Sequence, residues 1–176
     1  MIGELLFTVL ILAVGAERLA ELRVARRNAA WSFARGGVES GQGHYRVMVA
    51  LHTGLLVGAL AEVWLRRPEL PGALAVMMLV LAAGSQALRW WCIATLGPRW
   101  NTRIIVVPDL PLVASGPYQW MRHPNYVAVV VEGFALPLVH GAWLTASIFT
   151  VANAALLAVR IRAENRALAV AGGPQR

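Results

Sequence analysis

Charged residues are scarce in this sequence: they make up 14% of 176 residues, whereas hydrophobic residues make up 58%. A soluble domain of this size needs more charge, so the composition argues against a soluble fold. The single cysteine, Cys92, excludes a disulfide within the chain. We therefore predict an integral membrane protein, and the length of the chain fits one domain.

Signatures of soluble ligand-binding proteins are also missing. The "GQG" at 41–43 lacks the glycine spacing and the preceding strand of a dinucleotide-binding loop. His44 and His52 share a helix face, but no cysteine or histidine cluster accompanies them, so no metal site is predicted. The net charge of +7 first suggests nucleic acid. Clustered arginines at membrane boundaries explain that charge better, and no nucleic-acid partner is predicted.

Apolar segments dominate what is present, and a membrane-spanning helix needs about 20 mostly apolar residues. We predict an all-α fold of about five transmembrane helices, the last two forming a hairpin turned by Pro137 and Gly141. The helices are expected at 2–23, 44–65 and 73–96, followed by a hairpin that begins at Pro124, contains the run 127–159 and ends near 168. Residues 1–70 would form an N-terminal two-helix part, and 71–170 a catalytic core. Within the polar region 97–125, "RIIVVPDLPLV" predicts a short extended segment.

The basic residues indicate an orientation. All 16 are arginine, and fourteen fall in three regions: the end of the first helix with the loop after it, the third helix with the polar region after it, and the C-terminal end. Five spans with the N-terminus outside and the C-terminus in the cytoplasm place all fourteen on the cytoplasmic side. Arg66 and Arg67 then lie on the outer side.

Ionisable residues inside apolar segments are costly, so each is a functional candidate. Glu62 also fits an interfacial position, and Arg89 also fits a side chain that reaches the cytoplasmic surface. Glu132 is either a structural ion-pair partner or a catalytic group. Glu164, set among arginines, also fits a surface ion pair on its helix.

The turn "GPYQWMRHPNY" precedes the hairpin. Arg122 and His123 stand where a helix begins, and a helix N-terminus offers free N–H groups and positive potential. The turn therefore predicts a site at the membrane surface for a carboxylate or a phosphate.

This turn, with the later "RIRAENRAL", resembles the isoprenylcysteine carboxyl methyltransferase family over about 85–168. Asn165 stands where that family carries a second glutamate. "ERLAELRVARRNAAW", "ESGQGHYRVMVALH" and "LRWWCIATLGPRWNTRIIVVP" extend the resemblance to a bacterial branch associated with type III polyketide synthases, taken to methylate alkylpyrones or alkylresorcinols.

The resemblance implies a bacterial inner-membrane enzyme that uses S-adenosylmethionine, bound in a cytoplasm-facing pocket, and a hydrophobic or lipid acceptor dissolved in the bilayer. It implies cofactor-binding roles for Tyr118, Arg122, His123, Pro124, Tyr126, Arg162 and Glu164. Arg89 would orient the acceptor, and Trp100 and Asn101 would lie between acceptor and cofactor. A carboxylate acceptor needs no base, whereas a phenol or an enol does, for which Glu132 and Glu164 are candidates.

Two other functions remain open. A membrane reductase using NADPH would share a similar C-terminal turn, although such enzymes usually have more helices. A non-catalytic membrane subunit would leave the residues of 116–126 unexplained. A prenylated protein is a further alternative as acceptor, and the oligomeric state is open.

Overall fold

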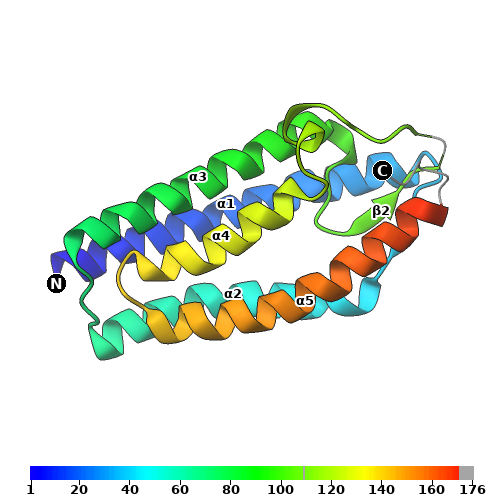
Figure 1. Cartoon of the computed structure of the whole chain (residues 1–176). Helices are drawn as coiled ribbons and strands as arrows, with labels where there is room; N and C mark the ends of the chain where they lie inside the picture. The colour runs from blue at the N-terminus through cyan, green and yellow to red at the C-terminus, as the bar shows by residue number, and fades with distance from the viewer. Residues whose placement is uncertain (109, 171–176) are drawn as a thin grey trace.

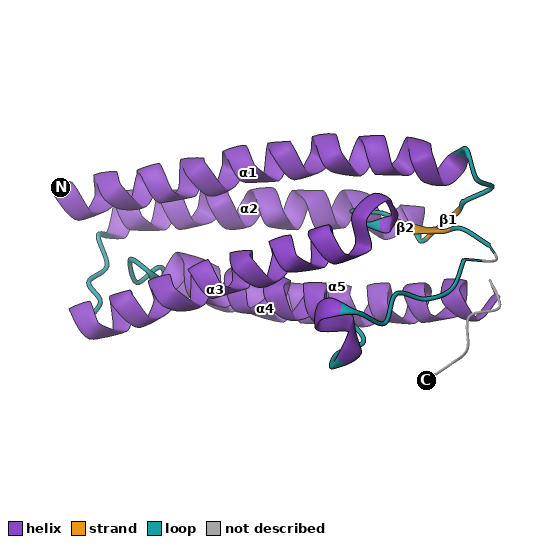
Figure 2. Ribbon diagram, turned by 90° about the horizontal axis from the view of Figure 1, so that it is seen from above, coloured by secondary structure: helices purple, strands orange, loops and turns teal. Residues whose placement is uncertain are grey.

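Five helices run along one common direction in the computed structural model, which describes residues 1–108 and 110–170 (Figures 1 and 2). Arg176, one of the fourteen arginines above, lies outside the described residues. The helices are α1 Ile2–Phe33, α2 Gln42–Arg66, α3 Gly72–Leu96, α4 Pro124–Leu138 and α5 Trp143–Val170. Two 3-10 turns, η1 Gly97–Arg99 and η2 Gly116–Gln119, lie between α3 and α4. The predicted helical membrane fold is thereby confirmed.

Proline and glycine set the boundaries that the sequence predicted. α2 ends at Arg66; the next residue, Arg67, has a left-handed φ of 47°, and Pro68 follows. Pro124 is the first residue of α4, where its missing N–H costs no helical hydrogen bond. Gly141, with φ of 73°, turns the chain between α4 and α5. The C-terminal hairpin is therefore present as expected, but Pro137 lies inside α4 and the turn comes after it.

The predicted end of the first helix at Arg23 is wrong, because α1 continues to Phe33. The segment after Arg23 is polar but contains no glycine or proline before Gly36, so nothing in the backbone stops the helix. Asn28 also ties this extension to the loop after α3, donating hydrogen bonds to the carbonyls of Gly97 at 3.1 Å and Trp100 at 2.8 Å. The apolar part of α1 therefore stops near Arg23, while the helix itself continues through the polar segment.

A small antiparallel sheet closes one end of the bundle. β1 Val38–Ser40 follows α1 and pairs with β2 Ile104–Val106, with Glu39 opposite Ile105. The predicted extended segment is thus confirmed, and its partner comes from the connection between α1 and α2. We call this end of the molecule the sheet end; the N-terminus and the α4–α5 turn lie at the opposite end (Figure 1).

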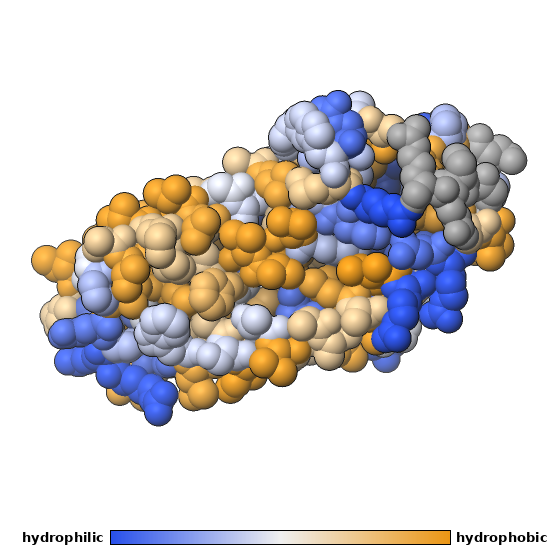
Figure 3. Space-filling view, in the orientation of Figure 1, coloured by the Kyte–Doolittle hydropathy of each residue, from blue (hydrophilic) through white to orange (hydrophobic). Residues whose placement is uncertain are grey.

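Apolar side chains cover much of the middle of the molecule, and hydrophilic ones gather towards both ends (Figure 3). Among the described residues, three helices are long and apolar enough to span a membrane: α2, α3 with the turn that follows it, and α5. α4 has 15 residues, or roughly 22 Å, which is shorter than the apolar core of a bilayer. α1 carries Glu17, Arg18 and Glu21 in its middle, where they enter the site described next.

Candidate functional site

A cavity of about 1270 Å³ lies among α1, α2, α4, α5 and the loops of the sheet end. A pocket for one small ligand usually encloses about 300–1,000 Å³, so this cavity has room for two molecules side by side. Leu12 and Leu19 of α1 and Val57 of α2 line it and are also exposed on the outer surface. The cavity therefore reaches the apolar surface between α1 and α2.

Four polar side chains meet at the sheet end of this cavity. Tyr126 of α4 donates a hydrogen bond to Glu164 of α5, with 2.6 Å between Oη and Oε2. His123 stacks on the Tyr126 ring with 5.3 Å between centroids, and its Nδ1 lies 3.6 Å from Glu164 Oε2. Tyr118, in η2, lines the same space. Burial raises the pKa of the Tyr118 phenol, so the hydroxyl stays protonated at neutral pH.

The N-terminus of α4 opens towards this group. His123 is the residue before the helix and makes no side-chain cap. Pro124 has no N–H, and the amides of Tyr126 and Val127 donate to the His123 carbonyl. Among the described contacts of this turn, the amide of Asn125 is therefore the N–H left for an anion. Asn125 also lines the cavity, and its Oδ1 is buried without a hydrogen-bond partner among the described residues. An unpaired buried acceptor costs free energy, which a ligand donor can recover. This end of the cavity therefore offers both donors and acceptors.

The predicted basic residues separate into two groups here. Arg122 and Arg162 are exposed, and neither side chain contacts Glu164. Arg122 still lines the cavity, whereas Arg162 does not, and its Nε bonds to the carbonyl of Ala158 in its own helix. Arg160, which the sequence did not single out, is 5% exposed and lines the cavity. Its Nη2 donates to the carbonyl of Thr102 at 3.0 Å. Pro124 is buried and starts α4 without lining the cavity.

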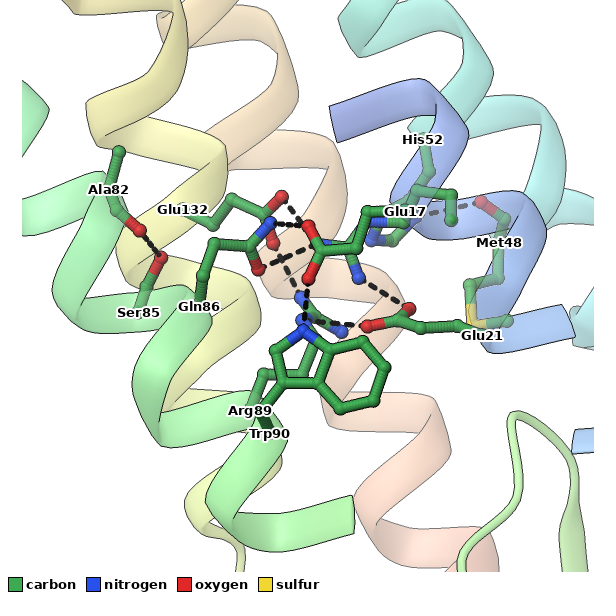
Figure 4. Close-up of polar contacts among 11 residues, drawn as sticks. Glu17, Glu21, Met48, His52, Ala82, Ser85, Gln86, Arg89, Trp90 and Glu132 are labelled. Carbon is green, nitrogen blue, oxygen red and sulfur yellow. Dashed lines mark hydrogen bonds and ion pairs between the residues drawn. The ribbon is translucent and has the colours of Figure 1, made fainter. Parts of the chain in front are cut away.

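A network of buried charges lies deeper in the bundle (Figure 4). Glu132 of α4 accepts from Arg89 of α3 at 2.5 Å and from Arg18 of α1 at 2.7 Å. Arg18 also bonds Glu21 at 2.5 Å, and Gln86 at 2.9 Å. Paired in this way, charged groups become tolerable away from water.

A second carboxylate of α1, Glu17, extends this network towards the surface of the bundle. It accepts hydrogen bonds from Gln86 and from the indole of Trp90. Hydrogen bonds and ion pairs between side chains therefore hold α1 against α3 and α4.

Two fully buried atoms of this network have no hydrogen bond among the described residues: Arg89 Nε and Glu21 Oε1, which face each other as an ion pair at 3.6 Å. Both residues line the cavity. The contact of Arg89 with an acceptor stays a prediction, whereas both oxygens of Glu132 are already engaged. That engagement favours the structural reading of Glu132.

Trp100 and Asn101 also line the cavity. Trp100 is 3% exposed and packs with Ala25 and Ile93. Asn101 donates to the carbonyl of Ala25 at 3.0 Å, and its Oδ1 accepts from the amide of Arg103. Both the nitrogen and the oxygen of the Asn101 side chain therefore hold the loop in place. The role of Asn101 towards a substrate stays a prediction.

Sequence reasoning missed the contribution of α1 to the site. Glu17, Arg18 and Glu21 were visible in "ERLAEL" but stood where a membrane helix was expected to end. Glu17 and Arg18 precede Glu21 by four and three residues, which places each of them beside Glu21 on the helix surface; this spacing was the available signal. His52 of α2, set aside as a metal ligand, lines the cavity. Among the described residues there is no group of three or more metal-binding side chains.

Comparison with known proteins identifies relatives over most of the chain. The model of the isoprenylcysteine carboxyl methyltransferase (ICMT) family matches residues 74–170, which is more than half of the sequence. The uncharacterized protein YpbQ of Bacillus subtilis (strain 168) is 39% identical over 163 residues, covering 93% of this chain and 96% of that protein. The family match holds α3, α4 and α5, which carry Arg89, Tyr126 and Glu164.

Proposed function

We propose a function from one premise: the chain belongs to the isoprenylcysteine carboxyl methyltransferase family of membrane methyltransferases. The proposed function is that of an S-adenosylmethionine-dependent O-methyltransferase that acts on a hydrophobic acceptor dissolved in the bilayer. The observation that carries this proposal is the single cavity with two unlike ends. One end is polar and lies under the loops of the sheet end, and the other reaches the apolar surface between α1 and α2.

The polar end fits the cofactor chemically. S-adenosylmethionine carries a carboxylate, an ammonium group and a positively charged sulfonium. His123 and the backbone amide of Asn125, at the start of α4, would hold the carboxylate. Glu164, fixed by Tyr126 at 2.6 Å, would balance the positive groups. The unpaired Oδ1 of Asn125 is a further acceptor for an ammonium or hydroxyl hydrogen.

The rest of the cavity suits the acceptor. Its long apolar wall, open between α1 and α2, would take an alkyl or isoprenoid chain directly from the membrane. Arg89 would meet the polar head of this molecule, because its positively charged side chain lines the cavity. The arginine-rich sheet end would face the cytoplasm, with the N-terminus on the outer side of a bacterial inner membrane.

Methyl transfer needs little covalent help from the protein. The cofactor supplies an electrophilic methyl group. The chain supplies position: Glu164, Tyr126 and His123 hold one reactant, and Arg89 aligns the other within the same water-poor space. Such alignment accounts for much of the acceleration of a two-reactant displacement. Arg89 would also stabilise negative charge on the acceptor oxygen.

The acceptor is proposed as an alkylpyrone- or alkylresorcinol-like lipid, with an isoprenylcysteine-type carboxylate as the alternative. Both have an apolar chain and an oxygen nucleophile, which the cavity accommodates equally. The roles of Arg122, Pro124, Arg162, Trp100 and Asn101 stay predictions. Asn165 lines the cavity beside Glu164, but as an amide it cannot supply a second negative charge.

Titration calorimetry on detergent-purified protein tests the cofactor first, with NADPH as the competing ligand. We expect saturable binding of S-adenosylmethionine and none of NADPH. Glu164→Gln should weaken binding about tenfold or more, because it removes a negative charge that faces a cationic ligand. Glu69→Gln, an exposed change at the opposite end, is the matched control.

The alternatives give different results in the same titration. Binding of NADPH alone would indicate a membrane reductase. Binding of neither ligand by folded protein would favour a non-catalytic membrane subunit. Transfer of a labelled methyl group to long-chain phenols, pyrones or carboxylates then identifies the acceptor class.

A further inference from the structure

His52 is a histidine inside the cavity to which the function above assigns no role. It projects from the middle of α2, lines the cavity and packs its ring edge-on against Phe149 of α5, with 5.3 Å between centroids. Its Nδ1 lies 2.9 Å from the carbonyl oxygen of Met48, one turn earlier in the same helix. Figure 4 shows this contact beside the charged network.

The contact with Met48 fixes the tautomer of the ring. A carbonyl oxygen only accepts hydrogen bonds, so His52 Nδ1 must carry the hydrogen and donate it. In the neutral ring, Nε2 then holds a lone pair. No described residue donates to His52 Nε2, and this atom is not among the fully buried atoms that lack a partner. The lone pair is therefore accessible within the cavity.

Charged groups surround this position from three helices. Arg18 of α1, Arg89 of α3 and Glu132 of α4 lie close enough to act on the charge of the ring. Glu132 is fully engaged by the two arginines. From α5, Phe149 packs on the ring and Asn153 lines the cavity, and neither is charged. Among these neighbours, the lone pair of His52 can accept the hydrogen of a hydroxyl group, and the guanidinium of Arg89, which also lines the cavity, supplies positive charge.

We propose that His52 is the catalytic base of the methyl transfer and that the acceptor is consequently a hydroxyl compound, a phenol or an enol on an apolar chain, rather than a carboxylate. This inference rests on the proposed function. A carboxylate is already ionised and has no proton to give, so it would make no use of this lone pair. A phenol or enol becomes a good nucleophile only as its proton leaves.

The step balances as follows in atoms and charge. The acceptor oxygen forms a bond to the methyl carbon, and the carbon–sulfur bond breaks with its electron pair going to sulfur. The hydroxyl proton passes to His52 Nε2, which becomes an imidazolium and later releases the proton to water. Arg89 balances the negative charge that develops on oxygen before the methyl group arrives.

The experiment compares His52→Asn with His44→Asn. An asparagine amide can still donate to the Met48 carbonyl but provides no basic nitrogen, so the local contact survives while the base is lost. His44 is on the same helix and does not line the cavity. Transfer of labelled methyl from S-adenosylmethionine is measured with 5-pentadecylresorcinol and with palmitate as probes, from acid to alkaline pH.

With the resorcinol, we expect wild-type kcat to rise with pH as the His52 ring becomes neutral and then to level off. His52→Asn should lower kcat about 100-fold at neutral pH, in line with the usual contribution of a general base. It should also abolish the rise, while calorimetric binding of S-adenosylmethionine stays within twofold. His44→Asn should match the wild type. Retention of the wild-type kcat and pH profile by His52→Asn, or transfer to palmitate alone, would overturn the proposal.

A readout without turnover separates this inference from the proposed function. In protein labelled with 15N-histidine, His52 should show the Nδ1–H tautomer, and the Nε2 signal should shift when the resorcinol is added. Failure of S-adenosylmethionine binding in the wild type would refute the proposed function. Normal cofactor binding with an Nε2 signal that the resorcinol leaves unmoved would refute only the role of His52.

Discussion

Replacing Glu132 by glutamine tests the buried charge network at its centre. The two carboxylate oxygens accept from Arg18 at 2.7 Å and from Arg89 at 2.5 Å, and the Glu132 side chain is 7% exposed. Glutamine has the same shape but keeps one acceptor oxygen, and its amide group directs hydrogens at the other arginine. In the variant, one of the two arginines loses its charge-assisted hydrogen bond. That buried arginine then faces the NH2 group of glutamine, a donor, where the wild type has a carboxylate oxygen, an acceptor.

The magnitude follows from what each arginine retains. Arg18 still bonds Glu21 and Gln86, whereas Arg89 keeps only Glu21, at 3.6 Å. A lost hydrogen bond to a charged group costs about 1.5–3 kcal/mol, and breaking a buried ion pair by removing one partner costs about 3–5 kcal/mol. Because Arg89 retains one distant carboxylate, we expect Glu132→Gln to lower the free energy of unfolding by about 3 kcal/mol.

Reversible unfolding in mixed micelles of mild detergent and sodium dodecyl sulfate, followed by tryptophan fluorescence, measures this change. Glu69→Gln at an exposed position should shift the free energy of unfolding by less than about 0.5 kcal/mol. Arg89→Met in the Glu132→Gln background should cost less than the sum of the two single changes, since the unpaired charge is removed. A loss below about 1 kcal/mol for Glu132→Gln, or strict additivity with Arg89→Met, would refute the reasoning.

Three further predictions concern other contacts. Glu62 accepts hydrogen bonds from the amides of Leu144 and Thr145 at the start of α5, so Glu62→Ala should lower the free energy of unfolding by about 2–3 kcal/mol in the same assay, whereas Glu69→Ala should not. A Cβ on Gly133 would overlap the ring of Phe149, so Gly133→Ala should cost about 1–3 kcal/mol by overpacking, seen as thermal unfolding at a lower temperature. Arg160→Gln should weaken S-adenosylmethionine binding about tenfold in calorimetry, whereas Arg162→Gln should leave it unchanged. The reason is that, of these two residues, Arg160 lines the cavity and Arg162 does not. Equal effects of the two variants would contradict this placement.

Local signals in the sequence predicted much of this fold because they act within one or two turns of the chain. The apolar runs predicted the helices, and Pro124, Pro137 and Gly141 marked the C-terminal hairpin that the structure contains. The end of α1 was mispredicted because hydropathy measures fit to a membrane, not the ability to stay helical. Tertiary hydrogen bonds from Asn28 then stabilise the extension.

For the site too, local sequence signals predicted some features, and the packing of the helices decided the others. By itself, the sequence determined that the protein is a helical membrane protein, that a polar turn precedes α4, and that Arg89, Glu132 and Glu164 are unusual enough to matter. Arg160 and Arg162 differ by about 200° around α5, so the sequence shows that they face opposite ways but not which one faces inward. Only the tertiary structure turned Arg160 and His52 towards the cavity and brought Arg18 of α1 to Glu132 of α4, 114 residues apart. The reason is physical: the rotation of each helix about its own axis is set by packing against the others, which no local pattern records.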